Sequence, residues 1–395
     1  MRTKEVSSLQ ELISLTPGST KLIFVADVGA TNTRVSFIPQ QITNTEILFF
    51  KSKAGSIQQM IDFFQRTAEE AGDKICSRIV ASAIAIPGPI TDGGKVTVIA
   101  NFAAKDTAGR TLHVDQLPKR VCPLGRTTLL NDLHACASGI AALNHIGVLA
   151  GSFSRMWASN SSSGSSKNKS SSLPTNEYNQ TSEDSISLGK GSVVVLAPGT
   201  GLGTALLYYR PDNGRFLTIP LEFGHVNLAT FKEDELVRKW AKALGRGDEH
   251  PPEYDDTCSG RGLEFIYNQY LNKGNTSLPA PSISKLAREQ GEPKAVKAFT
   301  IMYSLLMNLA SNLSMGFVPL TVVIAGDNAV RHSFFLGKSS NVKLLHDEFL
   351  SHTTERMGFM SKVQCLRQQK EMNLNLIGAA FEASNRVQKW RRSHL

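Results

Sequence analysis

Two strand–turn–strand segments of the same design constrain the fold of this 395-residue chain more than any other feature. The first covers residues 22–38 and the second residues 191–209, and both turns are rich in glycine and threonine. Small side chains let backbone N–H groups approach a phosphate chain, and an acidic residue at the turn entry can hold Mg²⁺ through water. Any tight hairpin also needs such residues. One copy alone is weak evidence, whereas the pair indicates an ATP site.

The elements predicted after the first hairpin are those of an α/β domain. Residues 79–86 form an almost continuous apolar run, which is typical of a central strand covered on both faces. Further strands and helices of this part are predicted at 46–51, 57–70, 127–130 and 133–142. We therefore predict a small α/β domain over residues 1–130 and a large α/β domain over residues 131–395.

The second half repeats this theme around the second hairpin. Helices are predicted at 233–244, 259–270 and 295–315, followed by an apolar strand at 320–325. Residues 159–187 contain 12 serines among 29 residues and almost no large apolar side chains. Such a segment cannot bury enough surface to offset its ordering entropy, so we predict a disordered insertion.

Composition excludes several functional classes. The hydrophobic content of 41% supplies a sizeable core, and the formal net charge of +9 favours anionic small molecules. The basic residues are scattered and not interleaved with aromatic residues, which argues against nucleic-acid binding. No apolar run is long enough for a membrane span or a secretion signal. The five cysteines include no C-x-x-C pair, which favours reduced, buried thiols.

The last three residues, Ser393-His394-Leu395, form a conservative variant of the S-K-L peroxisomal address. Arg391 and Arg392 precede them and keep this segment solvated. The sequence therefore predicts recognition by a peroxisomal-type import receptor, and the alternative is a frayed basic tail.

Asn131 and Asp132 follow an apolar strand, at the strand end where open α/β sheets bind ligands. Asp132 can accept the proton of an attacking hydroxyl group, and Asn131 can orient that hydroxyl. The alternative is helix capping, because Asn and Asp are preferred N-caps and a helix follows immediately.

Acidic side chains and a histidine in the second half suit sugar recognition. Glu222 and His225 lie three residues apart around a glycine, and Asp255 lies in an acidic turn before Ser259-Gly260-Arg261-Gly262. Sugar hydroxyls donate and accept hydrogen bonds at once, so acidic residues with His and Asn read them well. The alternatives are an ordinary core or surface histidine and a solvated, capping turn.

Seven motifs in order resemble those of the bacterial-type, ATP-dependent glucokinases, particularly the glycosomal glucokinases, from about residue 22 to residue 380. They are D-V-G-A-T-N-T-R at 27–34, P-G-P at 87–89, L-N-D-L at 130–133, A-P-G-T-G-L-G-T at 197–204, L-E-F-G-H at 221–225, S-G-R-G-L-E at 259–264 and A-G-D-N at 325–328. The resemblance implies a two-lobed, actin-like ATPase fold of duplicated ribonuclease H-like halves, with ATP and sugar in an interlobe cleft.

The resemblance also implies the activity and the site residues. ATP and Mg²⁺ would phosphorylate glucose at O6, with Asp132 as general base. Glucose would be held by Asn101, Asn131, Asp132, Glu222, His225 and Asp255. The nucleotide would be held by Asp27, Gly29, Ala30, Thr31, Asn32, Gly199, Thr200, Gly201, Gly203, Gly326, Asp327 and Asn328, and Asp27 would hold the metal through water.

Three further expectations come from the family. A homodimer is implied, as is location in a glycosome, a peroxisome-like microbody, with the cytosol as the alternative. Asp255 departs from the family pattern, which has a glutamate there, and the shorter side chain implies either a looser sugar contact or a bridging water.

Two rival functions differ in class. One is a kinase for another hexose within the related repressor-and-kinase family, whose members carry a cysteine-rich zinc loop. Only Cys258 follows within 100 residues of His225, so that loop cannot form here. The other is a non-catalytic, sugar-sensing ATP-binding protein. Asp132 argues against it, because a binding module needs no general base.

Overall fold

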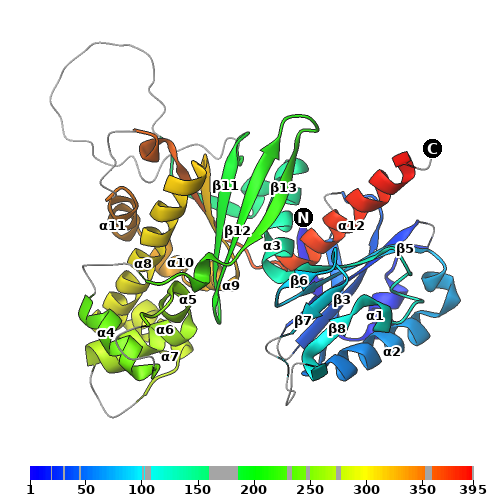
Figure 1. Ribbon diagram of the computed structural model, residues 1–395, viewed down its shortest axis with the longest axis horizontal. Coiled ribbons are helices and arrows are strands. Elements are labelled where there is room, and N and C mark those ends of the chain that lie inside the picture. Colours follow the sequence, from blue (N-terminus) through cyan, green and yellow to red (C-terminus); the bar gives the residue numbers. More distant parts are fainter. Residues whose placement is uncertain are drawn as a thin grey trace. The chain divides into compact units, whose positions relative to one another are not determined.

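The structure is a computed structural model that describes residues 1–18, 20–29, 32–43, 46–99, 102, 108–159, 186–228, 234–245, 250–272, 277–351 and 358–393, without the side chains of 389–393. The chain divides into two compact units (Figure 1). Unit 1 comprises Met1–Leu149 and Met372–Leu395, and unit 2 comprises Ala150–Glu371.

Unit 1 is built on a six-stranded sheet in the order β1-β4-β3-β2-β5-β9. These strands are β1 (Arg2–Glu5), β2 (Leu22–Val28), β3 (Asn32–Pro39), β4 (Glu46–Lys53), β5 (Ile79–Ile86) and β9 (Thr127–Asn131). The hairpin β2–β3 is antiparallel, and β2 pairs in parallel with β5. A small second sheet contains β6 (Ile90–Thr91), β7 (Val96–Val98) and β8 (Thr111–His113).

Two pairs of helices complete unit 1. The helices α1 (Leu9–Ser14) and α2 (Ile57–Cys76) contact each other, and α2 buries Met60 and Phe64 at helical spacing. Phe64 meets Phe24 of β2 edge-on at 5.4 Å between ring centroids. The helices α3 (Asp132–His145) and α12 (Leu374–Ser393) pack against each other, and α12 also contacts β2 and β5. The sheet is therefore central, as the apolar run of β5 predicts.

Unit 2 repeats the strand pattern of unit 1 in the order β10-β15-β14-β11-β12-β13. Its strands are β10 (Phe153–Trp157), β11 (Ser192–Pro198), β12 (Leu202–Arg210), β13 (Arg215–Leu221), β14 (Thr321–Ile324) and β15 (Gln364–Gln368). The strands β13, β12 and β11 are antiparallel neighbours, and β11, β14 and β15 are parallel neighbours. Because β4, β3, β2, β5 and β9 follow the same scheme, the predicted duplicated fold is confirmed.

A long helix, α8 (Pro293–Phe317), supplies the centre of the apolar core of unit 2. It buries Phe299 and Tyr303 completely and contacts α11 (Ser339–Phe349). The remaining helices are α4 (Asp234–Ala243), α5 (Tyr254–Thr257), α6 (Gly260–Phe265), α7 (Ala280–Lys285), α9 (Asp327–Arg331) and α10 (Ser333–Leu336). A seven-residue π-helical segment, η5 (Ile266–Asn272), continues α6.

The boundary between the units differs from the predicted one at residues 130 and 131. The helix α3, which begins at Asp132, stays with unit 1, and the chain returns to unit 1 at Met372 to add α12. The close packing of α3 on α12 explains the difference. Of the predicted insertion at 159–187, residues 160–185 lie outside the described residues, so its disorder stays a prediction.

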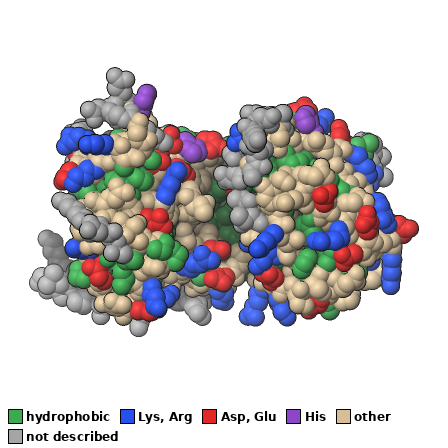
Figure 2. All heavy atoms as spheres, turned by 90° about the horizontal axis from the view of Figure 1, so that it is seen from below, with side chains coloured by type: hydrophobic (Ala, Val, Ile, Leu, Met, Phe, Trp, Pro, Cys, Tyr) green, Lys and Arg blue, Asp and Glu red, His purple; other side chains and the backbone are tan. Residues whose placement is uncertain are grey.

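Three expectations from composition concern the scattered basic residues, the absence of a membrane span and the buried cysteines. On the face shown in Figure 2, lysine and arginine side chains lie among aspartate and glutamate side chains. None of the described helices is both long enough and apolar enough to cross a membrane. The five cysteines all lie in the described part of the chain and are buried free thiols.

Candidate active site

The first glycine turn lies between β2 and β3 in unit 1. Gly29 N donates to Asn32 O at 2.8 Å, which closes the turn, while Ala30 and Thr31 lie outside the described residues. Asp27, near the end of β2, is 5% exposed. Its Oδ2 accepts hydrogen bonds from Arg34 Nη1 at 2.9 Å and Asn373 Nδ2 at 2.7 Å, and its Oδ1 accepts from Asn375 Nδ2 at 2.9 Å.

These contacts define how Asp27 can act on a metal ion. A carboxylate has about four lone-pair positions, and three donors already occupy Asp27. One lone-pair position remains, and the assignment of Asp27 to a metal-bound water stays a prediction. Asn373 and Asn375 are partners of Asp27 that the sequence reasoning missed, because nothing local links the start of α12 to a turn more than 300 residues earlier.

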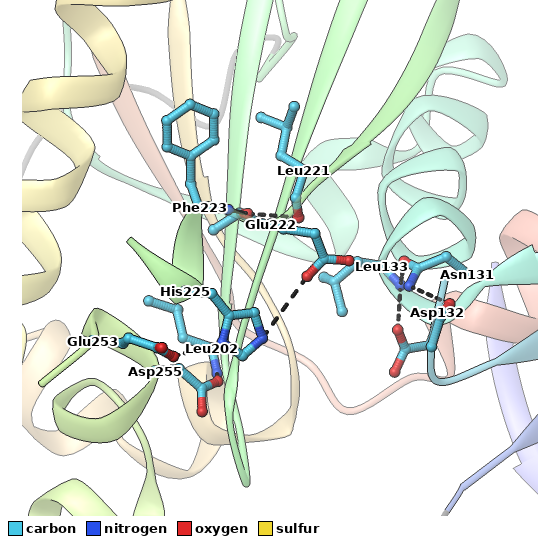
Figure 3. A network of polar contacts seen from close by, with 12 residues as sticks. Asn131, Asp132, Leu133, Leu202, Leu221, Glu222, Phe223, His225, Glu253 and Asp255 are labelled. Atoms are coloured by element: carbon cyan, nitrogen blue, oxygen red, sulfur yellow. Dashed lines mark hydrogen bonds and ion pairs between the residues drawn. The ribbon is translucent and has the colours of Figure 1, made fainter. Parts of the chain in front are cut away.

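Asn131 and Asp132 stand where β9 ends and α3 begins. Asn131 is the N-cap, and its Oδ1 accepts from Leu133 N at 2.9 Å and His134 N at 3.2 Å. Its Nδ2 donates to Gly88 O of the P-G-P motif at 3.1 Å. Asp132 is the first residue of the helix, and its Oδ1 accepts from Leu133 N at 2.8 Å (Figure 3). The capping role therefore belongs mainly to Asn131.

The second glycine turn lies between β11 and β12 in unit 2. Gly199 N donates to Gly201 O at 2.7 Å, and Gly199 O accepts from Gly260 N of α6 at 3.0 Å. A side chain at position 201 does not fit, because its Cβ would lie 2.4 Å from Asp255 Oδ1. The turn is therefore shaped by its own backbone and by the start of α6, which leaves its other backbone groups for a ligand.

Asp255 supports this turn. Its Oδ1 accepts from Leu202 N at 2.5 Å, and its Oδ2 pairs with Arg261. The carboxylate is 12% exposed. The described partners of Asp255 are the turn and Arg261, and its predicted contact with sugar stays a prediction. The second carboxylate of this segment, Asp256, is fully buried and accepts from Glu253 N at 2.9 Å.

A histidine lies between two carboxylates in unit 2 (Figure 3). His225 Nδ1 lies 2.8 Å from Glu253 Oε2, and His225 Nε2 lies 3.9 Å from Glu222 Oε2. The hydrogen bond with Glu253 raises the pKa of His225 above its ordinary value, partial burial opposes this, and the charges of Asp255, Glu253 and Glu222 add to the rise. The side chains of His225 and Glu222 are 57% and 69% exposed, so both can meet a ligand.

Glu253 was not predicted as a site residue. An isolated β-bridge pairs Asn227 with Glu253, and Tyr254 N donates to Val226 O at 3.2 Å, which brings the two segments together. No sequence signal predicts the contact between His225 and Glu253, because these residues lie 28 positions apart in the chain. Asn101, in contrast, was predicted and lies outside the described residues.

A pocket of about 370 Å³ lies beside the second turn, entirely within unit 2. Pro198 at the end of β11, Gly260 of α6 and Asn328 of α9 line it, together with apolar Met302. Three cationic side chains also border it, those of Lys285, Arg288 and Arg331. The volume lies in the range of small-molecule sites, and cations at an apolar pocket suit an anionic ligand with a flat apolar part.

The third nucleotide motif, residues 326–328, borders this pocket through Asn328. Gly326 N donates to Gln368 Oε1 at 2.9 Å, and Gln368 is fully buried at the end of β15. Of the predicted nucleotide-binding residues, Asn328 lines this pocket, and Pro198 directly before the second turn lines it too, so the nucleotide assignment stays a prediction. Within the described residues, no group of three or more His, Cys, Asp or Glu side chains is arranged to hold a metal ion.

Comparison with known proteins finds similarity to proteins described as glucokinases. A family model described as "Glucokinase" matches residues 170–357. The chain is 29% identical over 384 residues to a protein of Trichomonas vaginalis named "Probable glucokinase 2", covering 93% of both chains. The crystal structure of Leishmania braziliensis glucokinase superposes with a TM-score of 0.77 at 28% identity, covering 97% of this chain and 99% of that one. The structure of Balamuthia mandrillaris glucokinase with glucose gives 0.78 at 28% identity, covering 95% and 97%.

Proposed function

We propose that this chain, which is similar to glucokinases over most of its length, transfers the terminal phosphoryl group of ATP to the 6-hydroxyl group of D-glucose, yielding glucose 6-phosphate and ADP. One observation carries the proposal. Asn131 caps α3, and Asp132 places a carboxylate in the first turn of that helix, directly after the end of the apolar strand β9. This is the strand end at which open α/β sheets bind ligands.

Asp132 acts as the general base in the proposed reaction. An alcohol attacks phosphorus poorly unless its proton has an acceptor as the new bond forms. Asp132 accepts that proton from the 6-hydroxyl group, and Asn131 orients the sugar. Glu222 and His225 bind further hydroxyl groups, and Glu253 holds His225 in the orientation that its 2.8 Å contact defines.

In unit 2, the proposed nucleotide site consists of the second turn and the pocket beside it. The base and ribose occupy the 370 Å³ pocket, and the backbone of the second turn approaches the phosphates. Lys285, Arg288 and Arg331 supply positive charge around that pocket. Mg²⁺ bound with ATP neutralises phosphate charge, and Asp27 would hold it through water.

A coupled assay of ADP release tests this function. We expect ADP production that requires both glucose and Mg²⁺, with glucose 6-phosphate as the second product. Equal ADP production with and without glucose would indicate a sugar-independent ATPase and overturn the proposal. Faster turnover of another hexose would support the kinase activity but identify that hexose, and not glucose, as the preferred substrate.

We also propose that the protein acts in a glycosome and is imported through Ser393-His394-Leu395. The composition of the tripeptide and the basic residues before it support this assignment. Removal of the three residues is expected to leave a fluorescently tagged protein in the cytosol with unchanged kinetics. Import that survives the truncation would contradict the assignment.

The family resemblance supports a homodimer as the active form. Light scattering coupled to size-exclusion chromatography tests this proposal, with twice the mass of 43.0 kDa expected. A monomeric mass at the protein concentration of the activity assay would overturn it.

A further inference from the structure

A buried histidine lies in the wall of the nucleotide pocket and takes no part in the reaction as proposed above. His332 directly follows α9, is 7% exposed and lines the 370 Å³ pocket. Its ring meets that of Phe299 nearly at a right angle, with 4.7 Å between ring centroids. Aromatic packing therefore fixes the plane of the imidazole against the core of unit 2.

The partner of His332 determines which ring nitrogen carries the hydrogen. Tyr303 Oη lies 2.9 Å from His332 Nδ1. Burial lowers the pKa of His332 to about 4, and nearby Arg331 acts in the same direction, so the imidazole is neutral at pH 7. Burial raises the pKa of Tyr303 far above its ordinary value, so the phenol keeps its proton.

A buried hydroxyl group needs an acceptor for its hydrogen. Among the described residues, His332 Nδ1 is the acceptor recorded for Tyr303 Oη. Tyr303 therefore donates, Nδ1 accepts, and the single hydrogen of the neutral ring lies on Nε2. The Tyr303 contact occupies Nδ1, and no partner of Nε2 is found among the described residues. Because His332 is one of the residues that line the pocket, its Nε2–H is a candidate donor to a ligand there.

We propose that His332, held by Tyr303, donates a hydrogen bond from Nε2 to a ring nitrogen of the purine base of ATP and is a specificity-determining residue for the nucleotide. This inference rests on the proposed function. Apolar neighbours such as Met302 and Leu263 suit the faces of a flat base. A single oriented donor then distinguishes a base with a nitrogen acceptor at that position from one without it, because a buried donor left unpaired is costly.

Nucleotide analogues test the contact without altering the protein. The KM of the wild-type enzyme is measured for ATP and for its 1-deaza, 3-deaza and 7-deaza analogues, each of which replaces one ring nitrogen by C–H. One analogue is expected to raise KM by about 3- to 10-fold, the usual effect of one lost hydrogen bond. If all three analogues match ATP, the proposal is wrong.

Substitutions identify His332 as the donor. His332→Leu is expected to raise KM for ATP by a similar factor and to abolish the difference between ATP and the sensitive analogue. His332→Gln keeps an N–H donor near the position of Nε2 and should restore much of that difference. His346→Leu is the matched control, because His346 is a partly buried histidine of the same unit that stacks on Trp157 at 4.8 Å and does not line the pocket.

The outcomes separate this inference from the proposed function. Suppose the wild-type enzyme phosphorylates glucose and His332→Leu still distinguishes ATP from the sensitive analogue. His332 is then not the donor to the base, and the proposed kinase activity is unaffected. Wild-type enzyme with no glucose-dependent ADP production would overturn the function. Calorimetric titration with ATP and the analogues then decides the base contact independently of turnover.

Discussion

Asn131 and Asp132 are adjacent residues with separate tasks. Asn131 binds two backbone N–H groups of α3 and reaches the P-G-P motif, so it fixes where the helix begins. Asp132 then carries its carboxylate at a position set by that cap. The sequence alone left capping and catalysis open for both residues, because Asn and Asp suit either role.

Asp132→Asn is expected to lower kcat by about 10²- to 10⁴-fold, because the amide keeps the shape of the side chain but cannot act as a base. Glucose affinity, measured by calorimetry, is expected to stay close to the wild-type value. The matched control is Asn131→Ala, which removes the cap and should lower the free energy of unfolding by about 1 kcal/mol. Near wild-type turnover of Asp132→Asn would refute the catalytic role.

The contact between His225 and Glu253 predicts a pH dependence. The pKa of His225 is raised above its ordinary value near 6.5, so protonated His225 stabilises the site fully below that value. This contribution disappears as the pH rises through the higher, folded-state pKa. An NMR titration should therefore give His225 a pKa above 6.5, and Glu253→Gln should lower it.

Glu289→Gln serves as the control for that titration. Glu289 is also a carboxylate paired with a basic side chain in unit 2, but its partner is Arg288. An equal fall in the His225 pKa in both variants would show that general charge, and not the Glu253 contact, sets the pKa.

At the scale of elements, the packing of α3 against α12 keeps both helices in unit 1. Gly378 of α12 lies so close to α3 that a Cβ there would be 1.8 Å from Ala135 O. The helices also share a polar contact, in which Ser138 Oγ donates to Glu382 Oε1 at 2.8 Å. Close approach of the two backbones holds the helix that carries Asp132.

Gly378→Ala is expected to lower the free energy of unfolding by about 1–3 kcal/mol, because the added methyl group forces the two helices apart. Chemical denaturation measures the change. Gly316→Ala is the control, since Gly316 is an exposed residue of α8 with no atom within 4 Å of the added Cβ. That variant should be neutral or more stable by up to about 1 kcal/mol. Equal losses in both variants would contradict the packing argument.

At the scale of the whole molecule, the duplicated fold was predictable because its signals are local. Each hairpin and the apolar run of β5 lie within one continuous segment of the sequence. The boundary at residue 130 was not predictable, because the helix that holds α3 in unit 1 follows 240 residues later. The contacts of Glu253, Asn373 and Asn375 were not predictable for the same reason, since they join segments that are distant in the sequence.

Deletion of residues 164–181 is expected to leave the unfolding temperature and kcat unchanged. Loop-closure free energy varies by only about 0.6 kcal/mol for each doubling of loop length, and this segment has little apolar surface to bury. An 18-residue Gly-Ser replacement controls for the length of the connection. A large loss of stability in both variants would show that the native side chains of this segment pack on the protein.

Because the chain returns to unit 1 at Met372, unit 1 is completed after unit 2 during synthesis. Unit 2 is continuous from Ala150 to Glu371, so all of its strands have been made before α12 is translated. The Asp27 carboxylate, made early, obtains its amide partners Asn373 and Asn375 only after that. On the ribosome, the first unit begun is therefore the last to be completed. A chain that ends before residue 372 contains every described strand of unit 2, whereas Asp27 beside the first glycine turn still lacks Asn373 and Asn375.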